Sequence, residues 1–136
     1  MLLYLKSAIF LIFYFTGCAM TNSLVQFEAV SNPSTGYSWD VSMEGDGSFE
    51  LRRQVISSSS QRIAGAPVRE KFTLRSVNSG TVTVHFLYRR PWENGGRHVE
   101  YIFTFRINEE LQAELVDTQK TFFNGEGPDT LWLIVD

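Results

Sequence analysis

Apolar and polar residues alternate along most of the chain, and this alternation is typical of half-buried β-strands. The segment Arg69 to Val77 alternates Phe72 and Leu74 with charged or polar residues, and Thr81 to Tyr88 alternates Val, Phe and Tyr with Thr, His and Leu. Further strands are expected at Leu24 to Val30, Gly36 to Met43, Phe49 to Ile56 and Arg97 to Ile107. Because turn residues separate these segments and no helical period lies between them, the pattern predicts an all-β fold, a β-sandwich.

The connection at Ser57 to Pro67 differs from the other predicted turns in its length. It begins with four serines and continues with small and polar residues. A connection of about a dozen residues is unusual in a compact domain unless it is mobile or binds another molecule. We therefore treat it as a candidate functional segment.

The last part of the chain, residues 108–136, has a different pattern. Asn108 is a favourable helix N-cap and is followed by two glutamates, with Leu111, Leu115 and Val116 on one side of a helical projection. We therefore predict a short helix here. Thr130 to Val135 is almost wholly apolar and predicts a buried strand.

The turn between the first two expected strands is rich in residues that restrict or free the backbone. Pro33 fixes its own φ angle and disfavours helical geometry at Asn32, while Gly36 can take a positive φ. Ser34 and Thr35 are left at the apex, where small side chains would let the backbone approach another surface. The alternative is a simple connection between two strands, because the same residue types occur wherever strands reverse.

A tryptophan lies close to the tip of the last predicted hairpin. Trp92 stands between Pro91 and Glu93, and Asn94-Gly95-Gly96 follows, so the indole is poorly placed for burial in the core. An exposed aromatic side chain in a rigid loop is a favourable interface anchor. The alternative is that Trp92 folds back over the end of the sandwich and caps it.

Composition and charge exclude several classes of function. The 136 residues fit one domain, and 12 Lys and Arg against 15 Asp and Glu, without a basic run, give no electrostatic basis for nucleic-acid binding. His85 and His98 lie on strand patterns without a neighbouring cluster of Ser, Asp or Glu. We therefore expect no catalytic site, no metal and no cofactor.

The N-terminal segment is apolar and short. Leu2 to Phe15 is interrupted only by Lys6 and Ser7, and the uninterrupted part from Ala8 has the length of a signal-peptide core, well below a membrane span. We expect residues 1–18 to be a signal peptide and residues 19–136 to be a single exported domain, periplasmic, tethered to a surface or secreted.

The end of this segment, Phe15-Thr16-Gly17-Cys18, resembles a bacterial lipobox, which implies lipid attachment to Cys18 and membrane contact through that anchor alone. Ordinary cleavage after Gly17 or Ala19 is the alternative. Because Cys18 is the only cysteine, the exported domain contains no disulfide under either alternative, and its stability must come from core burial.

The candidate loops, in this order, resemble the motifs of a known family. Asn32 to Tyr37 resembles the Asn-Pro-Thr-Thr-Gly-aromatic motif, and Arg90-Pro91-Trp92 matches the Arg-Pro-Trp motif, of the chagasin-type inhibitors of papain-like cysteine peptidases. Gly65 to Phe72 occupies the place of the intermediate motif, a Gly-rich loop leading into a strand with a Phe. The family loop usually has Gly-X-Gly-Gly, whereas the last two positions here are Pro67 and Val68.

The resemblance implies an immunoglobulin-like sandwich with three loops side by side at one end. They would form a wedge that enters the cleft of a papain-like cysteine peptidase and inhibits it reversibly without chemistry. Thr35 matches the family residue set closest to the catalytic Cys and His, and Arg90 with Trp92 would pack on the primed side. We name the three segments loop one (residues 32–37), loop two (65–68) and loop three (90–92), and the expected contacts are Asn32, Pro33, Ser34, Thr35, Gly36, Tyr37, Gly65, Ala66, Pro67, Val68, Arg90, Pro91 and Trp92.

We expect a monomer whose partner is such a peptidase. The alternative function is a non-inhibitory immunoglobulin-like adhesion or envelope domain that keeps the loops as scaffold turns. Family members also begin with an extra strand, for which the chain has no room between Cys18 and Asn32. We hypothesise that the C-terminal strand at Thr130 to Val135 fills the sheet position of that missing strand.

Overall fold

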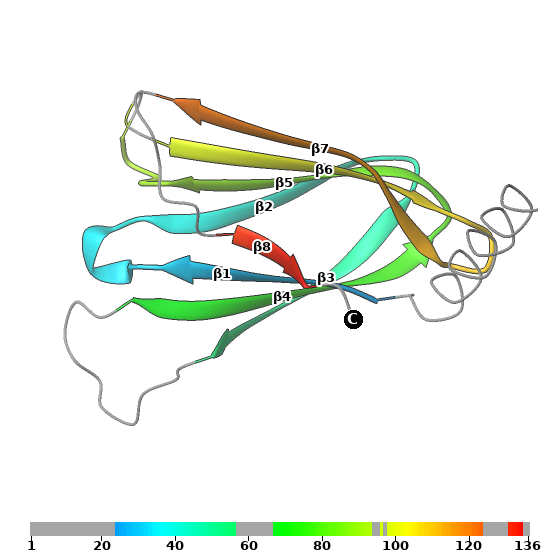
Figure 1. The fold of residues 1–136 in the computed structure, drawn as a ribbon, viewed down its shortest axis with the longest axis horizontal. Helices are drawn as coiled ribbons and strands as arrows, with labels where there is room; N and C mark the ends of the chain where they lie inside the picture. Colours follow the sequence, from blue (N-terminus) through cyan, green and yellow to red (C-terminus); the bar gives the residue numbers. More distant parts are fainter. Residues whose placement is uncertain (1–23, 57–66, 94–95, 97, 124–130, 135–136) are drawn as a thin grey trace, which may run out of the picture.

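The protein is a sandwich of two four-stranded antiparallel sheets, as the alternating pattern predicts (Figure 1). The computed structural model describes residues 24–56, 67–93, 96, 98–123 and, for the backbone, 131–134. The first sheet has the strand order β3-β4-β1-β8 and the second has the order β2-β5-β6-β7. The elements are β1 (Leu24–Ser31), η1 (Pro33–Thr35), β2 (Ser38–Gly45), β3 (Ser48–Ile56), β4 (Val68–Asn78), β5 (Gly80–Arg89), β6 (His98–Ile107), β7 (Ala113–Phe123) and β8 (Leu131–Ile134).

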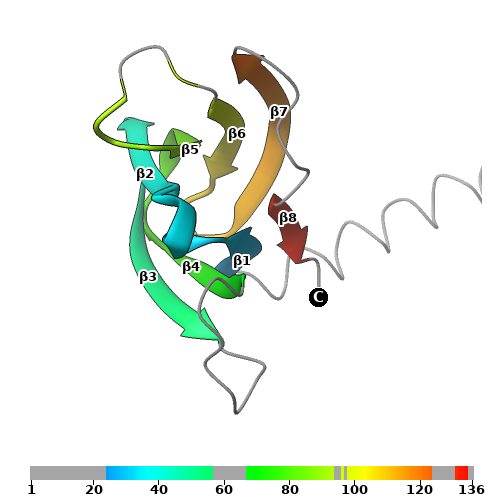
Figure 2. The ribbon, with the colours of Figure 1, turned by 90° about the vertical axis from the view of Figure 1, so that its left-hand side faces the viewer.

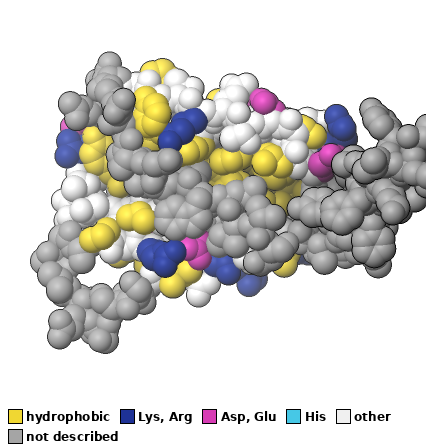
Figure 3. Space-filling model, in the orientation of Figure 1, with side chains coloured by type: hydrophobic (Ala, Val, Ile, Leu, Met, Phe, Trp, Pro, Cys, Tyr) yellow, Lys and Arg dark blue, Asp and Glu magenta, His cyan; other side chains and the backbone are white. Residues whose placement is uncertain are grey.

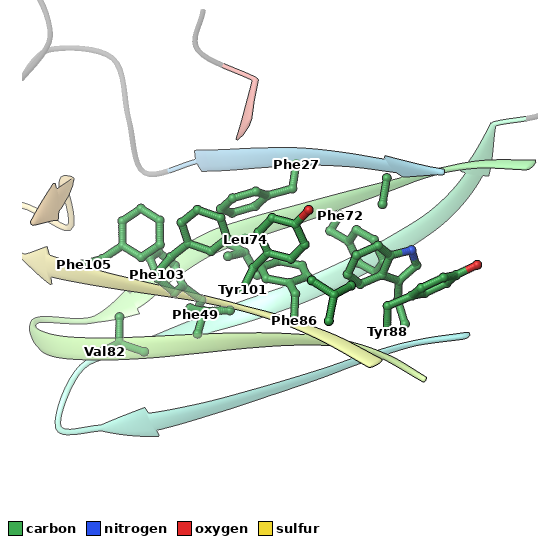
Figure 4. Packing of buried hydrophobic residues seen from close by; sticks show 14 of the residues in the cluster. Phe27, Phe49, Phe72, Leu74, Val82, Phe86, Tyr88, Tyr101, Phe103 and Phe105 are labelled. Carbon is green, nitrogen blue, oxygen red and sulfur yellow. The ribbon is translucent and has the colours of Figure 1, made fainter. Parts of the chain in front are cut away.

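The core is formed by the apolar rows that the alternation places on the inner face of each sheet. Phe27 of β1 is fully buried, and its ring centroid lies 4.7 Å from the centroids of both Phe86 and Phe103 in the opposite sheet. Figure 4 shows these rings between the two layers. Full burial of one such side chain contributes about 1.5–3 kcal/mol, so this aromatic cluster is a main source of the fold's stability.

The antiparallel order brings several connections to one end of the sandwich, which we call the loop end. Here β1 runs into β2 through loop one, β4 begins at Val68, and β5 runs into β6 through loop three. Figure 2 looks onto this end, and the short cyan segment of loop one lies near the middle of the view. The topology therefore places loop one, loop three and the described end of loop two, Pro67 and Val68, at the same end of the sandwich.

The short helix predicted after Asn108 is wrong. The Asn108 side chain accepts a hydrogen bond from the Gln112 amide at 2.8 Å, and Leu111 takes a φ of +62°, so these residues form a turn. The chain then continues as β7, which pairs with β6 from His98 to Ile107. Pairing along a whole strand satisfies the backbone of both β6 and β7, and this outweighs a weak local helix preference.

The strand predicted at Thr130 to Val135 is confirmed as β8, Leu131–Ile134. It pairs antiparallel with β1, with Leu133 opposite Phe27, so that β1 has a partner strand on each side. The placement of β8 beside β1 is compatible with the hypothesis that it replaces an additional first strand. That replacement stays a prediction.

The expected signal peptide, including Cys18, lies outside the described residues. Within the described part of the chain, no helix has the length and apolar character needed to cross a membrane. Across the same residues, no three His, Cys, Asp or Glu side chains are arranged as a metal site would require.

Candidate functional site

Loop one is a tight turn whose shape is held by its own hydrogen bonds. Pro33–Thr35 form a single turn of 3-10 helix, in which the Thr35 amide donates to the Asn32 carbonyl and the Gly36 amide donates to the Pro33 carbonyl, both at 3.0 Å. The Thr35 hydroxyl also donates to the Asn32 carbonyl at 2.6 Å. Pro33, Ser34 and Thr35 are all exposed, so the predicted apex does protrude from the sandwich.

Gly36 ends this turn in a conformation that suits glycine. Its φ is +81° and its ψ is −2°, which is the left-handed region. A Cβ atom added to Gly36 would lie only 2.2 Å from Cη2 of Trp92. The backbone angle therefore favours glycine at position 36, and a side chain there would have to displace the Trp92 ring.

Trp92 is exposed rather than folded over the core. Its side chain is 69% exposed, while the outer edge of its indole ring lies against Gly36. Of the two alternatives for this residue, the exposed position is the one that the structure adopts. The contact with Gly36 joins the tip of loop three to the end of loop one.

Arg90 links the same two loops by hydrogen bonds. Its Nε donates to the Thr35 carbonyl at 2.8 Å, and its Nη1 donates to Glu93 Oε1 at 2.9 Å. The guanidinium carbon also lies 4.7 Å from the centre of the Tyr37 ring, within the range of a cation–π contact. The sequence resemblance assigns Arg90 to peptidase contact, and in the structure its guanidinium also holds loop one.

Loop three is itself a turn closed by the backbone. The Glu93 amide donates to the Arg90 carbonyl at 3.1 Å, with Pro91 at the second position, where its fixed φ is favourable. The Glu93 side chain then returns to the Arg90 guanidinium at the i,i+3 spacing. Glu93 is a residue of the candidate site that the sequence analysis missed, although its i,i+3 spacing from Arg90 could have indicated it.

Tyr88 at the end of β5 supports loop one from below. Its hydroxyl accepts a hydrogen bond from the Asn32 amide at 3.1 Å, and its ring stacks on Tyr37 with centroids 5.2 Å apart. Burial raises the pKa of the Tyr88 hydroxyl above its ordinary value, and the nearby Glu70 carboxylate acts in the same direction. The hydroxyl therefore stays protonated at neutral pH, and no sequence pattern pointed to this role.

Loop two is described only in part. Gly65 and Ala66 lie outside the described residues, whereas Pro67 is exposed and Val68 is half-buried at the start of β4. Val68 pairs with Ser31, the last residue of β1. The start of β4 therefore lies directly beside the point where loop one begins.

The surface around the loop end carries apolar and basic side chains together. Figure 3 shows hydrophobic side chains next to Lys or Arg side chains toward the left of the view, where Figure 1 places the loop end. The two histidines lie on the sheet surface and not in the loops: His85 contacts Glu100 and Glu44, and the His98 ring stacks on Phe123.

The comparisons with known proteins agree with these motifs. A family model described as "Chagasin family peptidase inhibitor I42" matches residues 19–107. Amoebiasin-2 of Entamoeba histolytica is 33% identical over 76 residues, which is 54% of this chain, and the chain covers 61% of the length of that relative.

A solved structure, the cysteine protease inhibitor EhICP2 from Entamoeba histolytica, is 30% identical with a TM-score of 0.45. The similarity covers 54% of this chain and 67% of that one. The family model spans the two motif loops and the six strands from β1 to β6. This chain therefore belongs to the chagasin family of peptidase inhibitors.

Proposed function

We propose that the protein is a reversible inhibitor of papain-like cysteine peptidases that inserts loops one, two and three as a wedge into the active-site cleft. Family membership and the relative named as a cysteine protease inhibitor support the class of target. The proposed contacts are those of the three loops, with the apex of loop one at the centre.

The strongest support for this proposal is that loops one and three are already in contact in the free protein. Arg90 holds the Thr35 carbonyl, and Trp92 lies against Gly36. A preformed binding surface, here loops one and three, loses little conformational entropy when it docks, so an interface of ordinary size can bind tightly.

The geometry of loop one also explains how such a loop would resist cleavage. The Thr35 carbonyl is held by Arg90, and the peptide that follows leads into Gly36 in the left-handed region. This tight turn differs from the extended backbone of a β-strand. The loop can therefore fill the cleft and exclude substrate without presenting an extended peptide bond to the catalytic Cys.

Trp92 supplies the apolar part of the proposed contact. Its indole is 69% exposed and is held on one side by Gly36, so it offers a large surface with few remaining degrees of freedom. Aromatic side chains of this kind are the most frequent anchors of protein interfaces.

The direct experiment is a titration of papain and a small panel of cathepsins with the purified protein. We expect competitive, reversible inhibition, with one inhibitor bound per enzyme and a dissociation constant below about 1 μM. Full enzyme activity at micromolar protein across the panel would contradict the proposal and would favour a non-inhibitory adhesion or envelope domain.

We also propose that the domain is exported, with residues 1–18 as the signal peptide and Cys18 as the site of lipid attachment. The support is the apolar segment and its lipobox-like end. Mass spectrometry of the protein from a membrane fraction should find an N-terminal, lipid-modified Cys18. An unmodified N-terminus beyond Cys18 would exclude the lipid anchor and leave secretion, and an intact Met1 would exclude export by this route.

A further inference from the structure

Three hydrogen bonds lie at or beneath loop one, of which two join the two sheets and one joins Asn32 of the loop to the second sheet. Loop one starts from β1 in the first sheet and ends at β2 in the second sheet, so its two ends belong to different layers. The Trp39 indole donates to the Val30 carbonyl at 3.2 Å, and the Tyr88 hydroxyl accepts from the Asn32 amide at 3.1 Å. In the third bond, Arg53 Nη1 donates to the Trp39 carbonyl at 3.0 Å.

Arg53 also forms an ion pair with Glu70, in which the Glu70 side chain is only 6% exposed but the Arg53 side chain is 42% exposed. Arg53 is on β3 and Glu70 is on β4, and both the Nε and Nη2 atoms of Arg53 donate to Glu70 Oε1, at 2.9 and 2.7 Å. The guanidinium carbon also lies 5.3 Å from the centre of the Phe72 ring. Arg53 therefore joins a carboxylate and an aromatic ring of the first sheet to the backbone of the second sheet.

Stability alone does not account for a carboxylate at this position. Glu70 is only 5% exposed and lies in the inward row of β4 together with Phe72 and Leu74. Its Oε2 atom is buried without a hydrogen-bond partner among the described residues. Because the Glu70 carboxylate is buried, removing its charge from water offsets much of the stability that its ion pair with Arg53 contributes.

The position of the Arg53–Glu70 ion pair connects it to loop one. The Trp39 carbonyl that Arg53 holds is two residues beyond Tyr37, the last residue of loop one. Trp39 in turn donates to Val30, which is two residues before Asn32, the first residue of the loop. A chain of contacts therefore runs from Glu70 through Arg53 and Trp39 to Val30 and connects the two ends of loop one.

We propose that Arg53 and Glu70 are positioning residues that hold loop one in its inhibitory shape from beneath, without touching the peptidase. The expected loss of inhibition rests on the proposed function. The expected change in the shape of loop one does not, and amide hydrogen exchange measures that shape separately from inhibition.

The test uses the double variant Arg53→Met with Glu70→Leu, made in the full chain. The matched control is Arg75→Met with Glu50→Leu, because Arg75 and Glu50 form an exposed pair between the same two strands without reaching the second sheet. Each protein is measured for melting temperature, for backbone amide hydrogen exchange and for inhibition of papain.

We expect the Arg53/Glu70 double variant to stay folded and to melt close to the temperature of the parent protein, because Glu70→Leu removes a buried unpaired oxygen while Arg53→Met removes the hydrogen bonds of a half-exposed guanidinium. The amides of Thr35 and Gly36 should exchange at least about tenfold faster, since their hydrogen bonds depend on the loop's shape. Exchange at the Gly47 amide, which bonds the Thr81 carbonyl at 3.1 Å at the opposite end, should be unchanged. The inhibition constant should rise about tenfold, and the control should match the parent in all three measurements.

A second variant, Arg53→Lys, keeps the positive charge but removes the planar guanidinium group that donates to both the Glu70 carboxylate and the Trp39 carbonyl. It should also speed exchange at Thr35 and Gly36 while leaving Gly47 unchanged. Unaltered exchange at Thr35 and Gly36 in the folded variants would overturn the positioning role. If the parent protein fails to inhibit papain, the proposed function fails, and the exchange measurement still decides whether Arg53 and Glu70 position the loop.

Discussion

Gly36 is the residue at which loop one and loop three meet, and it allows the sharpest test of their contact. In Gly36→Ala, the new Cβ would face a φ of +81° and an indole atom at 2.2 Å. The left-handed conformation alone costs a residue with a side chain about 1–2 kcal/mol. We therefore expect Trp92 to be displaced, with a changed indole N–H signal for Trp92 in NMR spectra and an inhibition constant at least about tenfold higher. An unchanged indole signal would show that the contact is not formed in solution.

Substitution of Trp92 tests the apolar part of the proposed peptidase contact. Because its side chain is 69% exposed, Trp92→Ala should change the free energy of unfolding by no more than about 0.5 kcal/mol. If Trp92 is an interface anchor, the same change should raise the dissociation constant for papain by a factor of about ten or more. Val77→Ala removes another exposed apolar side chain, near the opposite end of β4, and should leave binding unaltered. Equal binding by both variants would remove Trp92 from the interface.

The sequence predicted single residues well where they belong to a motif, and poorly where the side chain binds a backbone atom of another segment. The sequence motifs placed Thr35 and Gly36 in one loop and Trp92 in another, and the structure brings these loops together. The bond from Arg90 to the Thr35 carbonyl could not be predicted, because it depends on the φ and ψ angles of loop one. The supports at Arg53 and Glu70 were missed for the same reason, since their meeting depends on strand register and on how the sheets stack.

The strands are the elements that the alternating pattern predicted best. From β1 to β6, each expected strand is present, and no end differs from the expected residue by more than two positions. The pattern failed at β7, where Glu109, Glu110 and the apolar residues after them resemble a helix start. Most side chains of β7 are exposed, so its alternation carries little burial signal and pairing with β6 decides its structure.

His85 on β5 should make the stability of the second sheet depend on pH. A hydrogen bond to the Glu100 carboxylate at 2.9 Å is the main cause that raises the pKa of His85, partial burial opposes it, and Glu44 at 3.1 Å adds to it. Because the folded pKa exceeds the ordinary value of about 6.5, the contribution to stability is complete below that value and is lost as the pH rises through the folded pKa.

The measurement is urea unfolding of the parent protein and of His85→Gln between pH 5 and pH 8. The stability advantage of the parent should be largest at pH 5 and should shrink toward pH 8. Glu100→Gln should weaken this trend more than Glu44→Gln does. An advantage that grows with pH would contradict the assigned charge state of His85.

The edge strand β8 should be required for the first sheet. It pairs with β1, which carries the central core residue Phe27. Deletion of residues 128–136 would make β1 the edge strand of the first sheet and should unfold the domain, make it aggregate or lower its melting temperature by several degrees. A control deletion of residues 135–136 alone should have little effect. An unchanged melting temperature in the longer deletion would refute the structural role of β8.

At the scale of the whole molecule, the fold separates stability from binding. The aromatic core around Phe27 lies between the sheets, while loops one and three protrude at one end and the β4–β5 hairpin turns at the other. A rigid sandwich of this kind can vary its loops without loss of the core. We therefore predict that a large side chain added at the loop end blocks peptidase binding and that the same side chain added at the opposite end does not.

The most direct test of this account compares papain binding by Thr35→Trp and Ser79→Trp. Thr35 is exposed at the apex of loop one, and Ser79 is exposed in the β4–β5 hairpin. Both variants should fold as the parent does, since neither position is buried. Calorimetric titration should show parent-like affinity for Ser79→Trp and an affinity at least about a hundredfold weaker for Thr35→Trp. Parent-like affinity for Thr35→Trp would contradict the claim that loop one enters the cleft.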